Sequence, residues 1–356
     1  MGKKLLIRSE SDNEVFLLTG KKLPLLSKLM PLLDGTRSEK EILDTLKDFD
    51  SEYIDKLLQN LKEKGIIEYL PSTTLNSEEI KRYTSQLLLF SHANASSAQH
   101  ILKKSRVAIL GLGEIGSKVL TSLTISGIGE ITGIDWNKVT KDDVYKNEFY
   151  KADDIGKKRA KVGAKRVKSL NSDINYIPID YEIKDNKNML SLVEKADFLS
   201  VCLDQEDSSV LRQMNDICLE SKTSWSSCYI RGLEGIVGPT IIPYRTACYH
   251  CYELRMGANI RHYEEYRAYQ EYKDKHLDRR VEFGGTNSFA SIVGSMFSLE
   301  VIKFLTKIKS PATLGKLLTI NFYNMIVEAH PILKFPRCPK CGIDRKDVPE
   351  EMIWNV

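Results

Sequence analysis

A chain of 356 residues with 28% charged residues and a formal net charge of +4 has the composition of a globular protein with two or three domains. The small net charge argues against a nucleic-acid-binding protein, and no apolar run reaches the roughly 18 residues that cross a membrane. The N-terminus lacks a signal peptide, so we expect a cytoplasmic protein whose seven cysteines favour metal binding over disulfides.

The first 70 residues have the pattern of a small separate domain. Two strands, three helices and a further strand are predicted, over residues 5–8, 15–18, 25–33, 38–46, 51–65 and 66–70. Ser38 is the expected N-cap of the second helix. This order predicts a winged-helix domain, a fold that serves in dimerisation or DNA binding. The mixed charge of the third helix makes phosphate contacts poor and argues against DNA.

A polar linker and a short helix are predicted over residues 71–100, before an α/β domain over 101–356. Residues 107–110 form a buried parallel strand in this prediction. The motif G-x-G-x-x-G follows, with its glycines at Gly111, Gly113 and Gly116. A helix and a second strand, 130–134, then lead to Asp135. Glycines permit a tight turn and a helix N-terminus offers amides to phosphate, so the unit predicts a Rossmann-like nucleotide fold.

Further elements alternate along the rest of the domain. Helices are predicted over residues 157–169, 187–195, 211–221 and 291–305, and strands over 174–177, 196–202, 225–230 and 236–242. Pro178 is expected to end the strand before it. Residues 260–280 carry a tyrosine at every third position between 263 and 272. Two interpretations stay open for this segment: a solvent-facing helix whose tyrosines pack on a neighbour, or a mobile loop over the site.

Cysteine spacing is the most specific chemical signal. Two C-x-x-C knuckles supply four thiolates, from Cys248, Cys251, Cys338 and Cys341. Each knuckle gives the short bite that tetrahedral zinc requires, and four thiolates leave no open position, so we predict a structural zinc. The alternative is a pair of redox dithiols. No catalytic nucleophile is assigned, because neither Cys202, Cys218 nor Cys228 has a visible histidine partner, and the role of Cys228 stays open.

The glycine motif, Asp135, the segment Asp154-Ile-Gly-Lys157, Asp204 after a later strand and the two knuckles together resemble the ThiF/MoeB family over residues 80–345. The resemblance implies Mg-ATP, transfer of AMP to a C-terminal carboxylate, and a homodimer. The pattern is most similar to ThiF-like proteins of ribosomal-peptide biosynthesis. In these, a PqqD-like winged helix binds a leader peptide as an added strand.

The phosphate-binding positions of that family are altered in this chain. Ser85, Asn137, Asp143, Lys146 and Arg159 stand where the family has arginine, aspartate, asparagine, arginine and lysine. Charge-assisted phosphate contacts contribute roughly 1.5–3 kcal/mol each, so several changes in one pocket weaken ATP binding. Asp143 is expected to repel phosphate. We predict a degenerate site, in which Mg-ATP is not a cofactor, formed by Gly111, Gly113, Gly116, Asp135, Asn137, Lys146, Arg159 and Asp204.

The resulting hypothesis is a scaffold that binds a leader peptide and delivers the precursor to a YcaO cyclodehydratase, with a flavin dehydrogenase as a further partner, in thiazole/oxazole or thiopeptide bacteriocin biosynthesis. The predicted peptide groove is lined by Phe16, Leu18, Tyr53, Leu57 and Leu61. Core packing is the alternative for these side chains. The alternative function is an active adenylating enzyme of the microcin-maturation type, and a DNA-binding regulator is the third.

Overall fold

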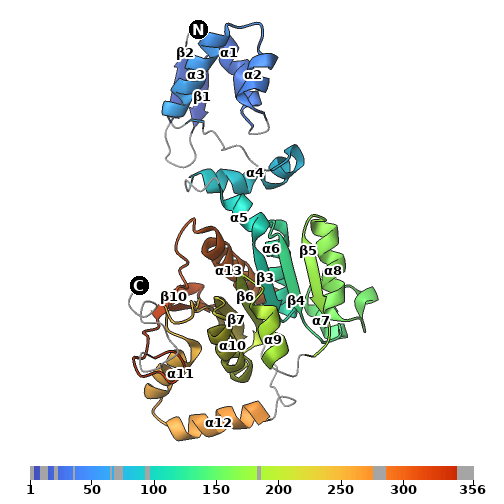
Figure 1. Cartoon of the computed structure of the whole chain (residues 1–356), viewed down its shortest axis with the longest axis vertical. Helices are drawn as coiled ribbons and strands as arrows, with labels where there is room; N and C mark the ends of the chain where they lie inside the picture. Colours follow the sequence, from blue (N-terminus) through green and yellow to red (C-terminus); the bar gives the residue numbers. More distant parts are fainter. Residues whose placement is uncertain are drawn as a thin grey trace. The chain divides into compact units, whose positions relative to one another are not determined.

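The computed structural model describes residues 4–8, 15–19, 23–34, 37–64, 66–67, 75–92, 97–182, 186–275 and 286–342. Two compact units form, one within residues 1–100 and the other within residues 101–356 (Figure 1).

The N-terminal unit combines a two-stranded sheet with short helices. Its elements are β1 (Lys4–Arg8), β2 (Val15–Thr19), α1 (Leu23–Leu29), the 3-10 helix η1 (Met30–Leu32), α2 (Glu39–Thr45), α3 (Ser51–Glu63) and α4 (Ser77–His92). The strands pair antiparallel, with Leu6 opposite Leu17. Ser38 caps α2 as predicted, because its hydroxyl accepts from the Glu41 amide at 3.3 Å and the Glu41 carboxylate accepts from the Ser38 amide at 2.7 Å.

Leucine and isoleucine side chains of α1, α2 and α3 form the core of this unit. Leu57 and Leu61 belong to that core and are buried, whereas Tyr53 of the predicted apolar stripe is 39% exposed. The strand expected over residues 66–70 is absent at Ile66 and Ile67, which pack against the helical core. Residues 68–70 lie outside the described part, so the winged-helix assignment stays a prediction.

The C-terminal unit is a Rossmann-like α/β fold built on an eight-stranded mixed sheet of order β10-β9-β8-β7-β6-β3-β4-β5. The strands are β3 (Arg106–Leu110), β4 (Glu130–Ile134), β5 (Asn175–Ile179), β6 (Phe198–Gln205), β7 (Trp225–Arg231), β8 (Glu234–Val237), β9 (Lys316–Asn321) and β10 (Ile326–Pro331). Strands β3 to β7 pair in parallel, and β7 to β10 pair antiparallel. The predicted fold class is therefore confirmed for this unit.

Helices cover both faces of the sheet (Figure 1). Helices α6 (Glu114–Ile125), α8 (Arg159–Leu170) and α13 (Asn287–Thr306) pack on one face, and α9 (Asn186–Val193) and α10 (Ser208–Ser221) cover the other. The remaining helices are α5 (Ala98–Lys104), which spans the boundary between the two units, α7 (Lys141–Lys146), the 3-10 helix η2 (Ala152–Asp154), α11 (Tyr249–Ala258) and α12 (Tyr263–Lys275). Successive side chains of β6 point to opposite faces of the sheet and so contact different helix layers. Phe198 packs on Phe304 of α13, whereas Leu199 joins the core cluster that α9 and α10 cover.

Two strand predictions are corrected by the sheet. Pro178 does not end β5 but lies within it, opposite Gly133 of β4. Because β5 is the edge strand, a residue without an amide hydrogen costs no ladder hydrogen bond on the open side. Strand β8 ends at Val237 rather than at residue 242, just before Pro239.

Two helices settle expectations about exposed and apolar segments. The tyrosine-rich segment forms α12, which confirms a helix over residues 263–275. Its four tyrosines at positions 263–272 are 37–59% exposed, so the structure does not bury them against a neighbour as expected. Helix α13 is the one described helix long and apolar enough to span a membrane. It packs against α6 and strands β6, β7 and β8, as the core helix of a globular domain does.

Glu300 fixes α13 to the sheet, and its removal tests this packing. The buried carboxylate accepts the Thr313 amide at 2.8 Å and the Thr313 hydroxyl at 3.0 Å, and it pairs with Lys303 at 2.7 Å. Glu300→Ala leaves the buried Thr313 amide without a partner, so we expect a loss of about 1–3 kcal/mol in urea unfolding. Exposed Glu194→Ala should change stability little. Equal stabilities of the two variants would contradict this role for Glu300.

Candidate nucleotide-type pocket and cysteine metal centre

The glycine motif follows β3, and its glycines are required by close packing within the fold. A Cβ at Gly111, where φ is +88°, would lie 2.1 Å from the Cys202 carbonyl oxygen. A Cβ at Gly113 would lie 1.9 Å from Asp204 Oδ2, and one at Gly116 would lie 2.0 Å from the Gly111 carbonyl oxygen. A larger residue at Gly111 would push β6 away from the loop, one at Gly113 would displace the Asp204 carboxylate, and one at Gly116 would clash with the loop backbone. The motif is thus explained by strand–loop–helix packing even without a bound phosphate.

Carboxylates of the chain itself occupy amides of the glycine loop. The Leu112 amide donates to Asp135 Oδ2 at 2.9 Å, and the Ile115 amide, in the first turn of α6, donates to Asp204 Oδ1 at 3.1 Å. A helix N-terminus is a ready site for an anion, and here Asp204 is that anion. Burial, together with the charges of Asp135 and Asp143, raises the pKa of Asp204 despite this hydrogen bond. These amides are therefore not free to receive phosphate in this structure.

Arg159, the first residue of α8, lies between two carboxylates. Its guanidinium donates to Asp143 Oδ1 at 2.7 Å and to Asp135 Oδ2 at 3.4 Å. Burial of Arg159 opposes its charge, but the carboxylates of Asp135 and Asp143 outweigh that effect and raise its pKa. The cation in the family's lysine position is thus held by partners within the protein.

Asp143, which we expected to repel phosphate, forms hydrogen bonds and an ion pair within the chain. Its Oδ2 accepts the Thr140 amide at 2.8 Å and so caps α7, while Arg159 neutralises its charge. The Asp143 carboxylate is therefore paired within the chain, and its repulsion of phosphate stays a prediction.

These groups surround a cavity of about 410 Å³ at the carboxyl ends of the parallel strands. It is lined by Gly111, Gly113, Asp135, Asn137, Arg159, Cys202, Leu203, Asp204 and Gln205. Of the predicted site residues, Gly116 packs against the loop backbone instead, and exposed Lys146 is near enough to Glu114 to influence its pKa. Ser85 lies exposed on α4, in the other unit.

Two residues that hold the glycine loop were missed by sequence reasoning. Asn147 donates to the Ser117 hydroxyl at 2.7 Å and to the Gly113 carbonyl at 3.4 Å. The buried Tyr150 hydroxyl donates to the Leu112 carbonyl. Asn147 could have been singled out, because it ends the segment that resembles a phosphate-binding motif. No sequence signal pointed to Tyr150.

The predicted peptide-binding residues divide into three cases. Leu57 and Leu61 are buried among α1, α2 and α3, which supports the core-packing alternative for them. Tyr53 is accessible on α3. The side chains of Phe16 and Leu18 lie outside the described part, although the backbone of both residues belongs to β2.

The four knuckle cysteines meet in one buried cluster, and their sulfurs lie within 4.8 Å of one another. Cys248 Sγ is 3.8 Å from Cys251 Sγ and 3.7 Å from Cys338 Sγ, and Cys251 Sγ is 3.5 Å from Cys341 Sγ. A tetrahedron with Zn–S bonds of about 2.3 Å places its sulfurs about 3.8 Å apart. The cluster therefore has the size and the donor set to bind a metal ion such as zinc.

Neighbouring contacts hold the C-terminal knuckle against the domain. The Phe335 amide donates to Cys251 Sγ at 3.4 Å, and Lys340 pairs with Asp216 of α10 at 2.6 Å. His250 pairs with Glu253 at 3.5 Å and is not one of the clustered ligands. Outside the cluster, Cys202 and Cys228 are buried opposite each other on β6 and β7, and Cys218 is buried in α10.

Comparisons with known proteins agree with this geometry. The model of the ThiF family matches residues 83–341. The molybdopterin-synthase adenylyltransferase of Salmonella typhimurium is 24% identical over 270 residues, which cover 75% of this chain and 98% of that protein. Vegetative protein HesA of Trichormus variabilis is 25% identical, over 77% of this chain and 94% of that protein. Two crystal structures of E. coli MccB share the fold, and each match covers 95% of this chain. The complex with MccA-N7isoASN has a TM-score of 0.67 at 22% identity, over 97% of that chain. The complex with ATP has a TM-score of 0.66 at 23% identity, over 98% of that chain.

Loss of one knuckle thiolate should remove the metal. We expect about one zinc per chain by elemental analysis of the wild-type protein and little in Cys338→Ser, because three protein ligands hold a structural zinc poorly. The thermal midpoint of Cys338→Ser should fall by about 5–10 °C. Cys218→Ser, which alters a buried thiol outside the cluster, should retain zinc. Equal zinc contents in the two variants would rule out the proposed ligand set.

Proposed function

The chain belongs to the ThiF family, and from this premise we propose that it binds the leader of a ribosomally made precursor peptide and presents that peptide without adenylating it. The observation that carries the second half of the proposal is the commitment of Arg159 to Asp135 and Asp143. A triphosphate would have to compete with two carboxylates for this guanidinium. It would also have to displace Asp204 from the α6 N-terminus.

The charge balance of the cavity makes that exchange costly. With all groups ionised, Arg159 faces Asp135, Asp143 and Asp204, so the pocket carries excess negative charge. Arg159 and its two carboxylates are largely buried, where electrostatic interactions are stronger than in water. A magnesium ion could offset this charge. The loss of the family's arginines at Ser85 and Lys146 nevertheless removes groups that would stabilise the departing pyrophosphate.

The N-terminal unit supplies the peptide-binding half of the proposal. We propose that this unit is a winged-helix domain that binds the leader. An extended leader would add a strand to the β1–β2 sheet and contact Tyr53 on α3. Main-chain hydrogen bonds at a sheet edge provide affinity, and side-chain pockets provide selectivity. MccB, whose fold covers 95% of this chain, has been crystallised with MccA, which supports a peptide ligand for this architecture.

The proposed partners follow from the scaffold role. A YcaO cyclodehydratase would use ATP itself and form azolines on the presented peptide, and a flavin dehydrogenase would oxidise them to azoles. We place the protein in the cytoplasm as a homodimer, with a structural zinc that ties the C-terminal knuckle to the domain. The natural products would be thiazole/oxazole-modified peptides or thiopeptide bacteriocins.

An adenylyltransferase is the second candidate. It is favoured by the relatives, among which are the adenylyltransferases of molybdopterin synthase and of the sulfur carrier protein ThiS. The cavity also keeps Asp135, Asp204 and the glycine loop. In this case AMP would be transferred to the C-terminal carboxylate of a peptide or small protein, with release of pyrophosphate.

Pyrophosphate exchange separates the two candidates. We expect no peptide-dependent incorporation of labelled pyrophosphate into ATP by the full chain, because Arg159 is unavailable to the phosphates. The molybdopterin-synthase adenylyltransferase of E. coli, with its own carrier protein, is the positive control for the assay. A parallel anisotropy titration with labelled leader peptides should show saturable binding. Exchange well above background with any peptide would replace the scaffold proposal by the adenylyltransferase.

A further inference from the structure

Helix α8 and the residues that lead into it concentrate positive charge on one part of the C-terminal unit. Residues 157–170 contain seven basic residues and no acidic one, at Lys157, Lys158, Arg159, Lys161, Lys165, Arg166 and Lys168. The net charge of the entire chain is only +4, so this is a local excess. Lys161, Lys165 and Lys168 are spaced four and three residues apart and share a helix face.

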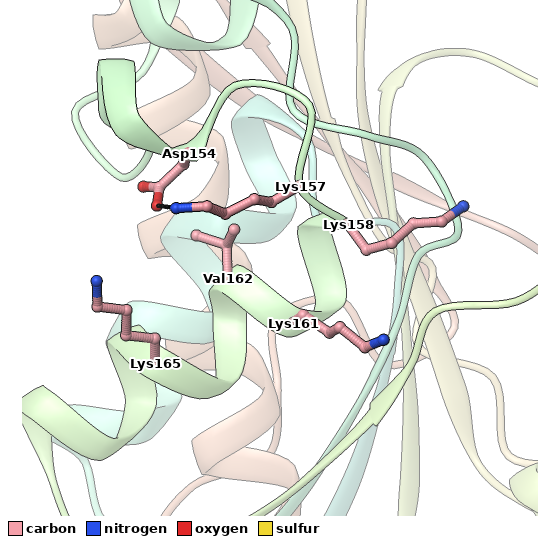
Figure 2. Close-up of a pocket in the computed structure, with 6 residues that line it drawn as sticks. All are labelled: Asp154, Lys157, Lys158, Lys161, Val162 and Lys165. Carbon is pink, nitrogen blue, oxygen red and sulfur yellow. Dashed lines mark ion pairs between the residues drawn. The ribbon is translucent and has the colours of Figure 1, made fainter.

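A concave site of about 260 Å³ lies within this basic region. Its lining is Asp154, Lys157, Lys158, Lys161, Val162 and Lys165 (Figure 2). In Figure 2 the ammonium groups of Lys157 and Lys165 lie on the same side as Asp154, with Val162 between the two lysines. Lys158 and Lys161 point to the opposite side. On that opposite side Lys158 donates to the Trp136 carbonyl and Lys161 pairs with Asp180 at 2.9 Å, so the cations open to a ligand are those of Lys157 and Lys165.

The acidic group at the rim is already neutralised. Asp154 Oδ2 accepts from Arg166 at 2.6 Å and from the Lys151 amide at 3.1 Å, whereas Lys157 approaches Oδ1 only to 3.8 Å. Lys165 forms no ion pair with any residue in the described part of the chain. The ammonium groups of Lys157 and Lys165 can therefore form ion pairs with a ligand.

We propose that this groove binds an acidic segment of the peptide that the protein presents, an inference that rests on the proposed scaffold function. One carboxylate would lie between Lys157 and Lys165, next to the nearly buried side chain of Val162. In an extended peptide alternate side chains lie about 6.6 Å apart on one face. A neighbouring carboxylate would therefore meet Lys168, about one helical turn from Lys165.

The lining favours a peptide over a nucleic acid. Single-stranded nucleic acid is held by aromatic side chains on which bases stack, and none of the six lining residues is aromatic. A small site with an aliphatic centre suits the stem and head group of glutamate. The groove would give the precursor a second binding site on the ThiF-like unit, in addition to the one proposed on the N-terminal unit.

Anisotropy titrations of the full chain with fluorescein-labelled hexaglutamate test the proposal. We expect saturable binding that weakens as salt screens the charges and that is at least about tenfold tighter than for labelled hexaglutamine. The double variant K157E/K165E should lose about tenfold or more in affinity. The control K187E/K195E, with the same change in net charge at exposed positions of and just after α9, should stay within about twofold.

Circular dichroism and zinc content establish that each variant is folded, and K165Q replaces the double variant if it is not. Equal losses in the two double variants would overturn the proposal, because net charge alone would then explain binding. So would tighter binding of a ten-residue oligothymidylate than of hexaglutamate, which would indicate a nucleic-acid surface. Absence of hexaglutamate binding would also overturn it, while leaving saturable leader binding and the absence of pyrophosphate exchange as separate tests of the scaffold.

Discussion

The ion pairs of Arg159 with Asp135 and Asp143 are the interaction on which this site depends. Arg159 begins α8, Asp135 follows β4, and Asp143 caps α7, so one guanidinium joins three segments at the carboxyl edge of the sheet. Removing one partner from such a buried group leaves uncompensated charge, which costs about 3–5 kcal/mol. The arrangement stabilises the fold at the position where a family member would bind phosphate.

The glycine loop is also held by hydrogen bonds and close packing within the chain. Its amides are used by Asp135 and Asp204, its carbonyls by Asn147 and Tyr150, and its glycines by the approach of β6. These contacts hold the loop between β3 and α6 in place.

At the other end of the sheet, the cysteine cluster connects distant parts of the sequence. Cys248 and Cys251 lie at the start of α11, and Cys338 and Cys341 follow β10, so a bound metal would tie the C-terminal segment to α10 and α11. Different interactions therefore hold the two regions. Buried ion pairs stabilise the pocket, and the cysteine cluster holds the C-terminal segment against the domain.

Features that depend on the spacing of nearby residues could be predicted from the sequence. The period of apolar residues and the glycine spacing predicted the β3–α6–β4 unit, and two C-x-x-C spacings predicted a cluster whose halves lie 86 residues apart. Contacts set by topology were not predictable. Pro178 looked like a strand breaker because its edge position was unknown, and the ion pair of Asp143 with Arg159, 16 residues away, could not be predicted from local pattern. A helix was predicted over residues 157–169, but the hollow beside α8, which Asp154 lines together with lysines of this segment, could not be predicted from local pattern.

The central claim is that the phosphate-binding groups of the pocket are committed to partners within the chain. Calorimetric titration of the zinc-loaded protein with Mg-ATP tests it most directly. The account predicts no binding heat up to millimolar ATP, because a triphosphate cannot take Arg159 from Asp135 and Asp143. A micromolar dissociation constant would contradict it and would show that these ion pairs open for a nucleotide.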